Sequence, residues 1–434
     1  MTILRLRYST WIAGLLIALA ATGVRAESLP TVQPEAVGLS SQRLARLDQV
    51  MQRHVDENEL AGVVMLIARH GKIAHFSAIG KMDLETGEEM RQDSIFRLYS
   101  MTKPITSVAL LMLYEEGNFQ LTDPIENYLP ALKDAKVFNG LDKADEMILV
   151  DPTRKVSIQD MFRHTAGLTY GFFSDTPVDK AYREAGIGLN PLKLKDLVDK
   201  IGTAPLLYQP GTQWVYSYSH DVQAYLVECL SGMPFDVYLR EKIFKPLGMA
   251  DTAFGLPQEK LDRYTTYYQS TELKDQVVSF DRLVPGLQPI DKPNTSEYLK
   301  GADFPGGGSG LVSTAADYFR FSQMLLNGGV YNGVRLLSPK TVALMTMDHV
   351  PVEADRAQLP PGYGFGLGVA VLVDPAAQGN LGSVGQYGWY GVATTRVLID
   401  PLEDMVMILL TQYAPMNFSL TGQFETLAYQ AIIE

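Results

Sequence analysis

Ser100 and Lys103 have a spacing that suits nucleophilic catalysis, and they form the one Ser-x-x-Lys sequence of the chain. Residues three apart on a helix share a face, so the Lys103 amine would lie one turn from the Ser100 hydroxyl. A serine hydroxyl needs a neighbouring base to act as a nucleophile at neutral pH. Burial favours the neutral form of an amine, and a neutral Lys103 would take the hydroxyl proton. In the alternative interpretation, Ser100 caps a helix and Lys103 faces solvent.

Two further segments place aromatic and glycine residues beside turns. Residues 214–218 (WVYSY) follow a Pro-Gly turn and precede an apolar helical pattern, so their tyrosines would lie on a loop that enters a helix. Residues 389–392 (WYGV) belong to a glycine-bearing strand pattern, where a substrate can approach backbone N–H groups closely. Such N–H groups can form half of an oxyanion hole. The alternative for both segments is plain aromatic packing.

The elements around these residues predict an α/β fold of the α+β kind. Apolar spacing predicts helices over residues 41–58, 105–113 and 420–433. Apolar and β-branched runs predict strands over residues 62–68, 72–80, 394–400 and 405–412. Because strands lie at both ends and helices between them, we expect a sheet part at about 27–98 and 301–434. A helical part, about 99–300, would be inserted between the two.

Composition and charge exclude several classes of protein. The chain has 434 residues and a formal net charge of −12, which argues against a nucleic-acid partner. It has one cysteine and no Cys/His cluster at zinc spacing, so we predict neither a disulfide scaffold nor a metal site. No sequence pattern implies an organic cofactor. We expect the cysteine, Cys229, to be an inert thiol buried on the apolar face of its helix.

The first 26 residues have the three-part pattern of a secretory signal peptide. Arg5 and Arg7 precede an apolar core over residues 11–21, and small residues at Val24 and Ala26 precede a cut before Glu27. This core is well short of the roughly 20 residues that span a bilayer. We therefore expect residues 27–434 to form an exported protein, periplasmic or secreted, without a permanent membrane anchor.

Several ordered segments together resemble the penicillin-recognising serine hydrolases, the superfamily of class C β-lactamases, D-Ala-D-Ala carboxypeptidases and family VIII carboxylesterases. Besides Ser100 and Lys103, the likeness is carried by residues 161–168 (MFRHTAGL), 216–218 (YSY), 243–252 (IFKPLGMADT), 306–314 (GGGSGLVST) and 389–391 (WYG). It covers about residues 35–430. The resemblance implies a β-lactamase/transpeptidase-like fold, which has a mostly antiparallel sheet with flanking helices plus a helical subdomain.

The resemblance also implies roles for single residues. Ser100 would be the acylated nucleophile and Lys103 its proton acceptor. Tyr216 would pass the proton to the leaving group and later activate the deacylating water. Tyr218 takes the third place of the family's Tyr-x-Asn motif. The backbone N–H groups of Ser100 and Val392 would form the oxyanion hole.

The third motif departs from the Lys-Thr-Gly or His-Thr-Gly pattern of β-lactamases and peptidases, because Trp389-Tyr390-Gly391 takes its place. The missing cation binds a substrate carboxylate, and a neutral indole cannot replace that charge-assisted hydrogen bond. A tryptophan here resembles the family VIII esterases. We therefore expect these three residues and Tyr218 to line a mainly apolar substrate site, which Tyr390 would narrow. Arg396, on the next strand, either supplies a carboxylate contact or is a solvated cation on an edge strand.

The leading hypothesis is a serine hydrolase that forms an acyl-enzyme with a small-molecule ester, short-chain or aryl. The same residues suit a class C-like β-lactamase, a D-Ala-D-Ala carboxypeptidase, or an amide hydrolase related to the aminohexanoate-dimer enzymes. The alternative of a different class is a non-catalytic penicillin- or cell-wall-binding protein on the same fold. The presence of Ser100, Lys103 and Tyr216 together argues against a pure binder.

The remaining polar candidates receive structural interpretations, and the oligomeric state stays open. We expect His164 to hydrogen-bond a loop. We expect Asp221 to favour the start of its helix, rather than to complete a Ser-His-Asp triad with His220.

Overall fold

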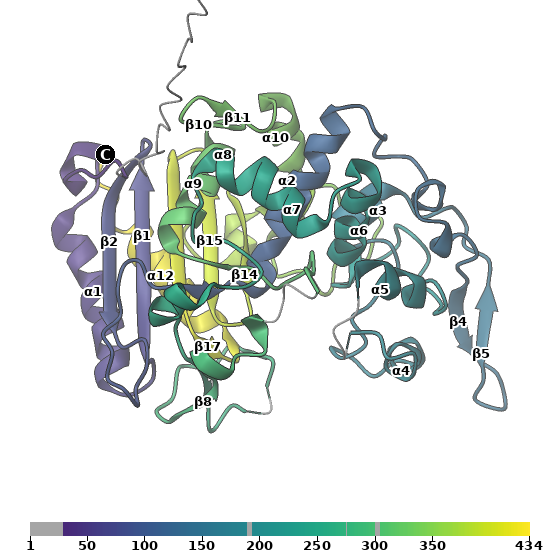
Figure 1. Ribbon diagram of the computed structural model, residues 1–434, viewed down its shortest axis with the longest axis horizontal. Coiled ribbons are helices and arrows are strands. Elements are labelled where there is room, and N and C mark those ends of the chain that lie inside the picture. Colours follow the sequence, from purple (N-terminus) through teal and green to yellow (C-terminus); the bar gives the residue numbers. More distant parts are fainter. Residues whose placement is uncertain (1–28, 189–192, 275, 300–303) are drawn as a thin grey trace, which may run out of the picture.

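A seven-stranded antiparallel sheet forms one part of the molecule, beside the helical region, and its strands come from both ends of the chain (Figure 1). The structure is a computed structural model that describes residues 29–188, 193–274, 276–299 and 304–434. The strands, in order across the sheet, are β12 (Tyr363–Phe365), β13 (Ala370–Leu372), β14 (Tyr387–Gly391), β15 (Thr395–Asp400), β16 (Met405–Thr411), β1 (Gly62–Arg69) and β2 (Lys72–Gly80). The pairing of β1 with β16 joins the N-terminal hairpin to the C-terminal strands. The predicted signal peptide, residues 1–26, lies outside the described residues.

Helices cover both faces of this sheet. They are α9 (Ala315–Leu326) with α2 (Thr102–Glu115) beside it on one face, and α1 (Ser41–Asp56) with α12 (Phe418–Tyr429) on the other. Alternate residues of a strand enter opposite cores: Leu66 packs on the side of α9 and Met65 on the side of α1. Because both faces are covered, β1 and β16 are buried along their whole length.

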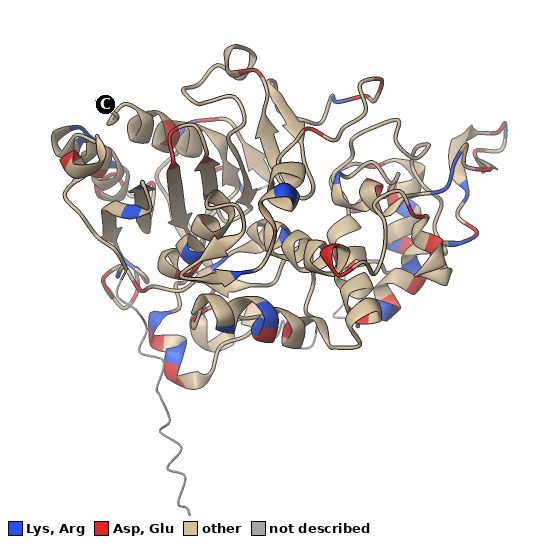
Figure 2. Cartoon of the chain, turned by 90° about the horizontal axis from the view of Figure 1, so that it is seen from above, with Lys and Arg blue, Asp and Glu red and all other residues tan. Residues whose placement is uncertain are grey.

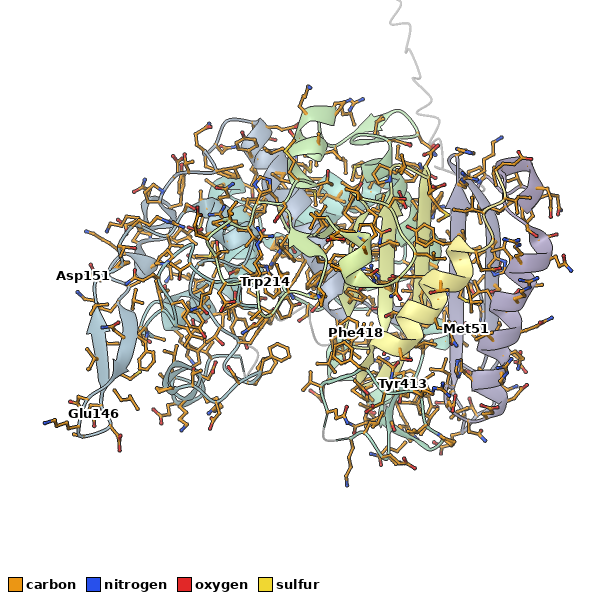
Figure 3. The ribbon with its side chains drawn as sticks, turned by 180° about the vertical axis from the view of Figure 1, so that it is seen from behind. Met51, Glu146, Asp151, Trp214, Tyr413 and Phe418 are labelled. Carbon is orange, nitrogen blue, oxygen red and sulfur yellow. The ribbon has the colours of Figure 1, made fainter. Side chains whose placement is uncertain are left out.

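The region between the two groups of sheet strands is mostly helical. Its helices are α3 (Ile158–Phe162), α4 (Pro177–Glu184), α5 (Leu194–Ile201), α6 (Ser219–Ser231), α7 (Phe235–Leu239) and α8 (Lys245–Leu247). It also contains the strands β4 (Val137–Leu141), β5 (Met147–Val150), β6 (Tyr267–Ser270), β7 (Val278–Ser279) and β8 (Leu287–Asp291). The β4–β5 hairpin lies at the end of the molecule farthest from α1, with Glu146 in its turn (Figures 1 and 3).

Short elements complete the fold. They are β3 (Phe96–Arg97), β9 (Val312–Ser313), β10 (Val330–Tyr331), β11 (Val334–Arg335), β17 (Tyr413–Ala414), β18 (Met416–Asn417), α10 (Pro339–Met345) and α11 (Pro375–Gln378). Figure 2 shows that charged residues lie mainly on the peripheral helices, hairpins and loops, while the central strands carry few. Among the helices of the described residues, none has the length and hydropathy needed to cross a bilayer.

The predicted α/β fold class is confirmed, and the predicted elements are present with shifted ends. The predicted helix over 41–58 is α1, and the predicted strands over 62–68, 72–80, 394–400 and 405–412 are β1, β2, β15 and β16. The closing helix, predicted over 420–433, begins at Phe418 instead. Its start is set by Asn417, whose side chain accepts a hydrogen bond from the Leu420 N–H at 2.8 Å.

The prediction of a buried Cys229 is wrong, because its side chain is exposed. The apolar spacing that predicted burial continues to the end of α6, but the buried part of that helix ends at Val227. Its last turn, from Glu228 onward, is only partly covered.

Candidate active site

Ser100 lies in a tight 3-10 turn, Tyr99–Met101, that leads directly into α2. The preceding residue, Tyr99, has a φ of 46°, a left-handed conformation that strains a bulky residue. Two phenol groups hold this backbone. Tyr298 Oη accepts a hydrogen bond from the Tyr99 N–H at 3.0 Å, and Tyr318 donates to the Met101 carbonyl at 2.8 Å. Strain of this kind persists only where the surrounding structure maintains it, and it clusters at active sites.

Lys103 and Tyr216 both reach the Ser100 hydroxyl. Lys103 Nζ lies 3.1 Å from Ser100 Oγ, and the Tyr216 hydroxyl donates to the same oxygen at 2.7 Å. Lys103 is 1% exposed, so the alternative of a solvent-facing lysine is wrong. Its Nζ also donates to the Gly308 carbonyl at 2.7 Å, which fixes the amine beside Ser100. Ser100 itself is partly exposed, so a hydroxyl, an amine and a phenol that could act as nucleophile and proton carriers meet at an accessible place.

A glycine-rich loop holds the amine of Lys103 from the side of α6. Asp221 Oδ1 accepts from the Gly308 N–H at 3.0 Å, while the Gly308 carbonyl binds Lys103. A Cβ on Gly307 would lie 2.1 Å from the His220 carbonyl oxygen, and one on Gly308 would lie 2.6 Å from Asp221 Oδ2. Only glycine therefore allows this approach. Burial raises the pKa of Asp221, and the Gly308 hydrogen bond acts in the opposite direction. Asp221 lies in the first turn of α6, as expected, but its contact with the loop was not predicted.

Gly391 brings the end of β14 against the turn that carries Ser100. A Cβ on Gly391 would lie 2.3 Å from the Leu98 carbonyl oxygen, so a larger residue would push the strand away. Val392 follows in the turn between β14 and β15. That turn includes Thr394 at a φ of 58°, held because Thr394 Oγ1 accepts from the Asn417 N–H at 3.0 Å. The backbones of Ser100 and Val392 thus belong to adjoining turns, where the predicted oxyanion hole would lie.

Trp389 joins the Ser100 group, whereas Tyr218 points elsewhere. The Trp389 indole donates to Tyr216 Oη at 3.4 Å, and the two rings are 5.6 Å apart. Tyr218 packs against Tyr170 at 4.5 Å, and its hydroxyl reaches Gly188, where a Cβ would lie 1.6 Å from it. Tyr218 therefore packs on Tyr170 and faces Gly188, and its ring and hydroxyl belong to that packing rather than to the group around Ser100.

Tyr390 and Arg396 pack together beside β14, away from Ser100. Arg396 is fully buried on β15, an interior strand, and its Nε donates to Glu425 at 2.6 Å. Its guanidinium lies 3.8 Å from the centre of the Tyr390 ring, which also meets Phe418 at 5.1 Å. Both interpretations of Arg396 are therefore wrong: it is neither a contact for a substrate carboxylate nor a solvated cation on an edge strand. Because side chains alternate along a strand, Trp389 faces Tyr216, while Tyr390 points to the other side and faces Arg396.

His164 and His220 form a buried pair behind Tyr216. His164 Nδ1 lies 3.2 Å from Ser217 Oγ, which confirms the expected hydrogen bond to a loop. The two imidazole rings are 4.8 Å apart, and His164 is 5.0 Å from the Tyr216 ring. Burial lowers the pKa of both histidines. No hydrogen bond between described residues joins either histidine to Ser100, so the expectation of no Ser-His-Asp triad agrees with the geometry.

An aromatic shell around Tyr216 was not predicted in full. Besides Trp389 and His164, the rings within about 6 Å of Tyr216 are Tyr170 at 5.1 Å, Phe173 at 5.9 Å and Trp214 at 6.1 Å. Trp214 lies near the middle of the molecule, between the sheet and the β4–β5 end (Figure 3). The aromatic-rich run at 170–173 (YGFF) follows the segment MFRHTAGL after a single residue, Thr169, and that position is the sequence signal that could have identified it. In the described part of the chain, no group of three or more His, Cys, Asp or Glu side chains could hold a metal ion.

Comparison with known proteins identifies relatives along most of the chain. The family described as Beta-lactamase matches residues 47–431. An uncharacterized protein of Mycobacterium tuberculosis is 34% identical over 373 residues, which are 83% of this chain and 88% of that protein. Esterase EstB of Burkholderia gladioli is 30% identical over 392 residues, 88% of this chain and 94% of the esterase. The solved structure of EstCE1, a hydrolase with promiscuous acyltransferase activity, has a TM-score of 0.72 and 26% identity and covers 91% of this chain and 99% of its own. These similarities confirm the predicted fold and the predicted resemblance to esterases.

Proposed function

The chain belongs to the beta-lactamase family and has the fold of its serine hydrolases, and from this premise we propose that it is a carboxylesterase that forms an acyl-enzyme on Ser100. The substrates would be short-chain or aryl esters. The observation that carries the proposal is the indole of Trp389, which contacts Tyr216 and takes the place of the cation in the Lys-Thr-Gly pattern that this segment resembles. The similarity to EstB supports the proposal.

In the first half of the proposed reaction, Ser100 Oγ attacks the carbonyl carbon of the ester. Lys103, 3.1 Å from that oxygen, accepts the proton. The N–H groups of Ser100 and Val392 would hold the negative charge that develops on the carbonyl oxygen. Tyr216 donates its proton to the alcohol oxygen as the carbon–oxygen bond breaks, and it is replenished from Lys103, whose Nζ lies 4.5 Å from the centre of its ring.

In the second half, water takes the place of the departed alcohol next to Tyr216. Tyr216, acting with Lys103, accepts a proton from this water, whose oxygen attacks the acyl carbon. The bond to Ser100 Oγ breaks, the serine recovers a proton, and a free carboxylic acid leaves. Both halves use the same atoms, so each residue returns to its starting state.

The surroundings of Ser100 favour a neutral ester over a substrate with a free carboxylate. Binding such a carboxylate needs a charge-assisted hydrogen bond, and Trp389 supplies only a neutral N–H. The cation on the neighbouring strand, Arg396, is buried in its pair with Glu425 and covered by Tyr390. The rings around Tyr216 provide apolar surface instead.

We also propose that residues 1–26 direct export and are then removed. The charged start, short apolar core and small residues before Glu27 support this. The test is the mass of the protein recovered from the periplasm and culture medium of an expressing bacterium. A chain that begins at Glu27 supports the proposal, and a full-length chain that remains in the cytoplasm contradicts it.

The test of the proposed activity compares three substrates with the purified chain 27–434. We expect kcat/KM to be highest for p-nitrophenyl butyrate, lower for nitrocefin and lowest for a D-Ala-D-Ala peptide. Ser100→Ala is the matched control for background hydrolysis. A higher kcat/KM for nitrocefin or the peptide would contradict the esterase proposal. Labelling by a fluorescent penicillin without turnover of any substrate would favour the binding-protein alternative.

A further inference from the structure

Two neighbouring phenylalanines, Phe172 and Phe173, stand exposed beside the Ser100 group. Their exposed fractions are 54% and 47%, in the loop between α3 and α4. Leaving a phenylalanine side chain in water forgoes the free energy of burying it. Adjacent exposed apolar side chains next to a reactive group are typical of a surface that binds a ligand.

The loop is braced so that this pair stays exposed. Gly171 precedes it with a φ of 77°, and a Cβ there would lie 2.9 Å from Tyr182 Cβ. The fully buried Asp179 accepts hydrogen bonds from Thr169 at 2.6 Å and from Ser174 at 2.5 Å, one on each side of the pair. The two rings are therefore presented by a fixed backbone rather than by a loose loop.

The pair continues the aromatic shell of the catalytic tyrosine out to the surface. The Phe173 ring lies 5.9 Å from the Tyr216 ring. Phe172 and Phe173 lie 5.3 Å and 5.5 Å from Tyr170, whose ring is 5.1 Å from that of Tyr216. The rings of Tyr216, Tyr170, Phe172 and Phe173 are thus in continuous contact from the Ser100 group to the surface, next to any group that is bound at Tyr216.

We propose that Phe172 and Phe173 bind the leaving alcohol of the ester and select alcohols that carry an aromatic ring. The inference rests on the proposed function, because it takes Tyr216 as the group that protonates the alcohol. When the Ser100 Oγ–carbon bond forms and the carbon–alcohol bond breaks, the proton ends on the alcohol oxygen. That oxygen must then lie beside the Tyr216 hydroxyl, so the rest of the alcohol lies next to the aromatic residues that pack around the Tyr216 ring. Aromatic rings attract each other beyond the free energy of burial.

The test uses two esters that share an acyl group, phenyl butyrate and ethyl butyrate, with the double variant F172A/F173A. Both esters form the same butyryl-enzyme, so a change confined to one ester arises in acylation. We expect kcat/KM for phenyl butyrate to fall about tenfold or more. For ethyl butyrate we expect a change of less than about threefold, because its alcohol has little apolar surface.

Phe280→Ala is the matched control. Phe280 is 79% exposed but stacks on Phe418 rather than on the Tyr216 shell, and its loss should leave both esters unchanged. Because Phe172 and Phe173 are exposed, the double variant should also keep the unfolding temperature of the wild type.

Three results would overturn the inference. Equal losses for both butyrates would show that the pair only supports the loop. A loss that follows the acyl group, seen by comparing phenyl acetate with phenyl butyrate, would place the pair on the acyl side. A wild-type chain that hydrolyses none of these esters would overturn the proposed function and this inference with it, so the two failures are distinguishable.

Discussion

The Tyr216 hydroxyl lies 2.7 Å from Ser100 Oγ, although the two residues are 116 positions apart in the sequence. The contact depends on the packing of α6 against α2, because Tyr216 lies just before α6 and Ser100 lies just before α2. Trp389 donates to the same phenol oxygen from β14. One oxygen atom therefore joins three separate parts of the chain, and the chemistry depends on all three.

The variant Ser100→Ala tests the nucleophile. It should lower kcat for p-nitrophenyl butyrate by about 10⁴-fold or more, because no other group replaces the attacking oxygen. Mass spectrometry of the wild type mixed with the ester should show an acyl adduct on the peptide that contains Ser100. The variant should unfold at the wild-type temperature, since the side chain is small and partly exposed. Retained turnover, or an adduct elsewhere, would contradict the assignment.

Tyr216→Phe removes the phenol hydroxyl but keeps the ring that packs on Trp214 and Trp389. We expect kcat/KM for ethyl butyrate to fall by about 10²–10⁴-fold, because ethoxide needs a proton to leave. The loss for p-nitrophenyl butyrate should be smaller, since p-nitrophenolate leaves without protonation. Equal losses for the two esters would remove Tyr216 from the protonation of the alcohol.

Local patterns in the sequence predicted the contact between Ser100 and Lys103 and the helix that follows, but not the direction of every aromatic side chain. Ser100 and Lys103 lie three residues apart where the 3-10 turn leads into α2, so local helical geometry already brings them close, and the Gly308 carbonyl then fixes the amine. Tyr218 was expected beside the substrate, yet it turns toward Gly188 and Tyr170. That direction is set by tertiary packing with residues distant in the sequence, and the spacing of residues 214–218 carries no information about it.

Arg396 shows why strand order matters for such predictions. Its strand, β15, resembles the edge of a C-terminal hairpin when only the local sequence is read. The long-range pairing of β1 with β16 and of β14 with β15 makes it an interior strand, and α12 supplies Glu425 from beyond the sheet. Neither the neighbouring strands of β15 nor Glu425 as the partner of Arg396 can be inferred from the alternation of residues along β15 itself. The hydrogen bond between Asp221 and Gly308, 87 residues apart, was missed for the same reason.

Asp221 acts as a positioning residue through Gly308, whose carbonyl binds Lys103. Asp221→Ala should lower kcat by about 10–100-fold because the buried Gly308 N–H loses its acceptor and the loop shifts. Asp221→Asn keeps an acceptor oxygen and should restore kcat to within about threefold of the wild type. A merely structural role would lower the unfolding temperature in both variants without this difference in kcat. Equal kcat values for the two variants would contradict the prediction.

Asp160 anchors the segment that leads to His164, and its titration predicts a pH dependence of stability. Burial raises the pKa of this carboxyl, but hydrogen bonds from Arg154 and the charge of Arg163 outweigh it and lower the pKa to about 2. An unfolded aspartate has a pKa of about 3.9. A carboxyl whose pKa is lower in the folded chain stabilises that chain at any pH above the pKa of the unfolded state. Asp160 therefore contributes about 2–3 kcal/mol to the free energy of unfolding near neutral pH, and this contribution is lost as the pH falls from 4 to 2.

The variant Asp160→Asn should therefore have a free energy of unfolding in urea at pH 7 that is lower than that of the wild type by about 2 kcal/mol or more. Its free energy of unfolding should also fall less between pH 4 and pH 2 than that of the wild type. Asp151→Asn is the control, because Asp151 forms an exposed pair with Lys136 near the β4–β5 hairpin (Figure 3). We expect its free energy of unfolding to stay close to that of the wild type, because exposed ion pairs contribute little to stability. Parallel pH profiles for the wild type and Asp160→Asn would contradict the assignment.

Arg396 and Glu425 form an ion pair in which both side chains are almost fully buried. Arg396→Met leaves the Glu425 charge without its partner and should lower the free energy of unfolding by about 3–5 kcal/mol. The double variant Arg396→Met/Glu425→Leu removes both charges and should recover most of that loss, as measured by urea unfolding. Because Arg396 contacts Tyr390 rather than the Ser100 group, kcat/KM of the folded double variant should stay within about threefold of the wild type. A double variant as unstable as the single one would show that packing rather than charge dominates this site. Loss of ester hydrolysis in the stable double variant would show that the pair positions β14 for catalysis.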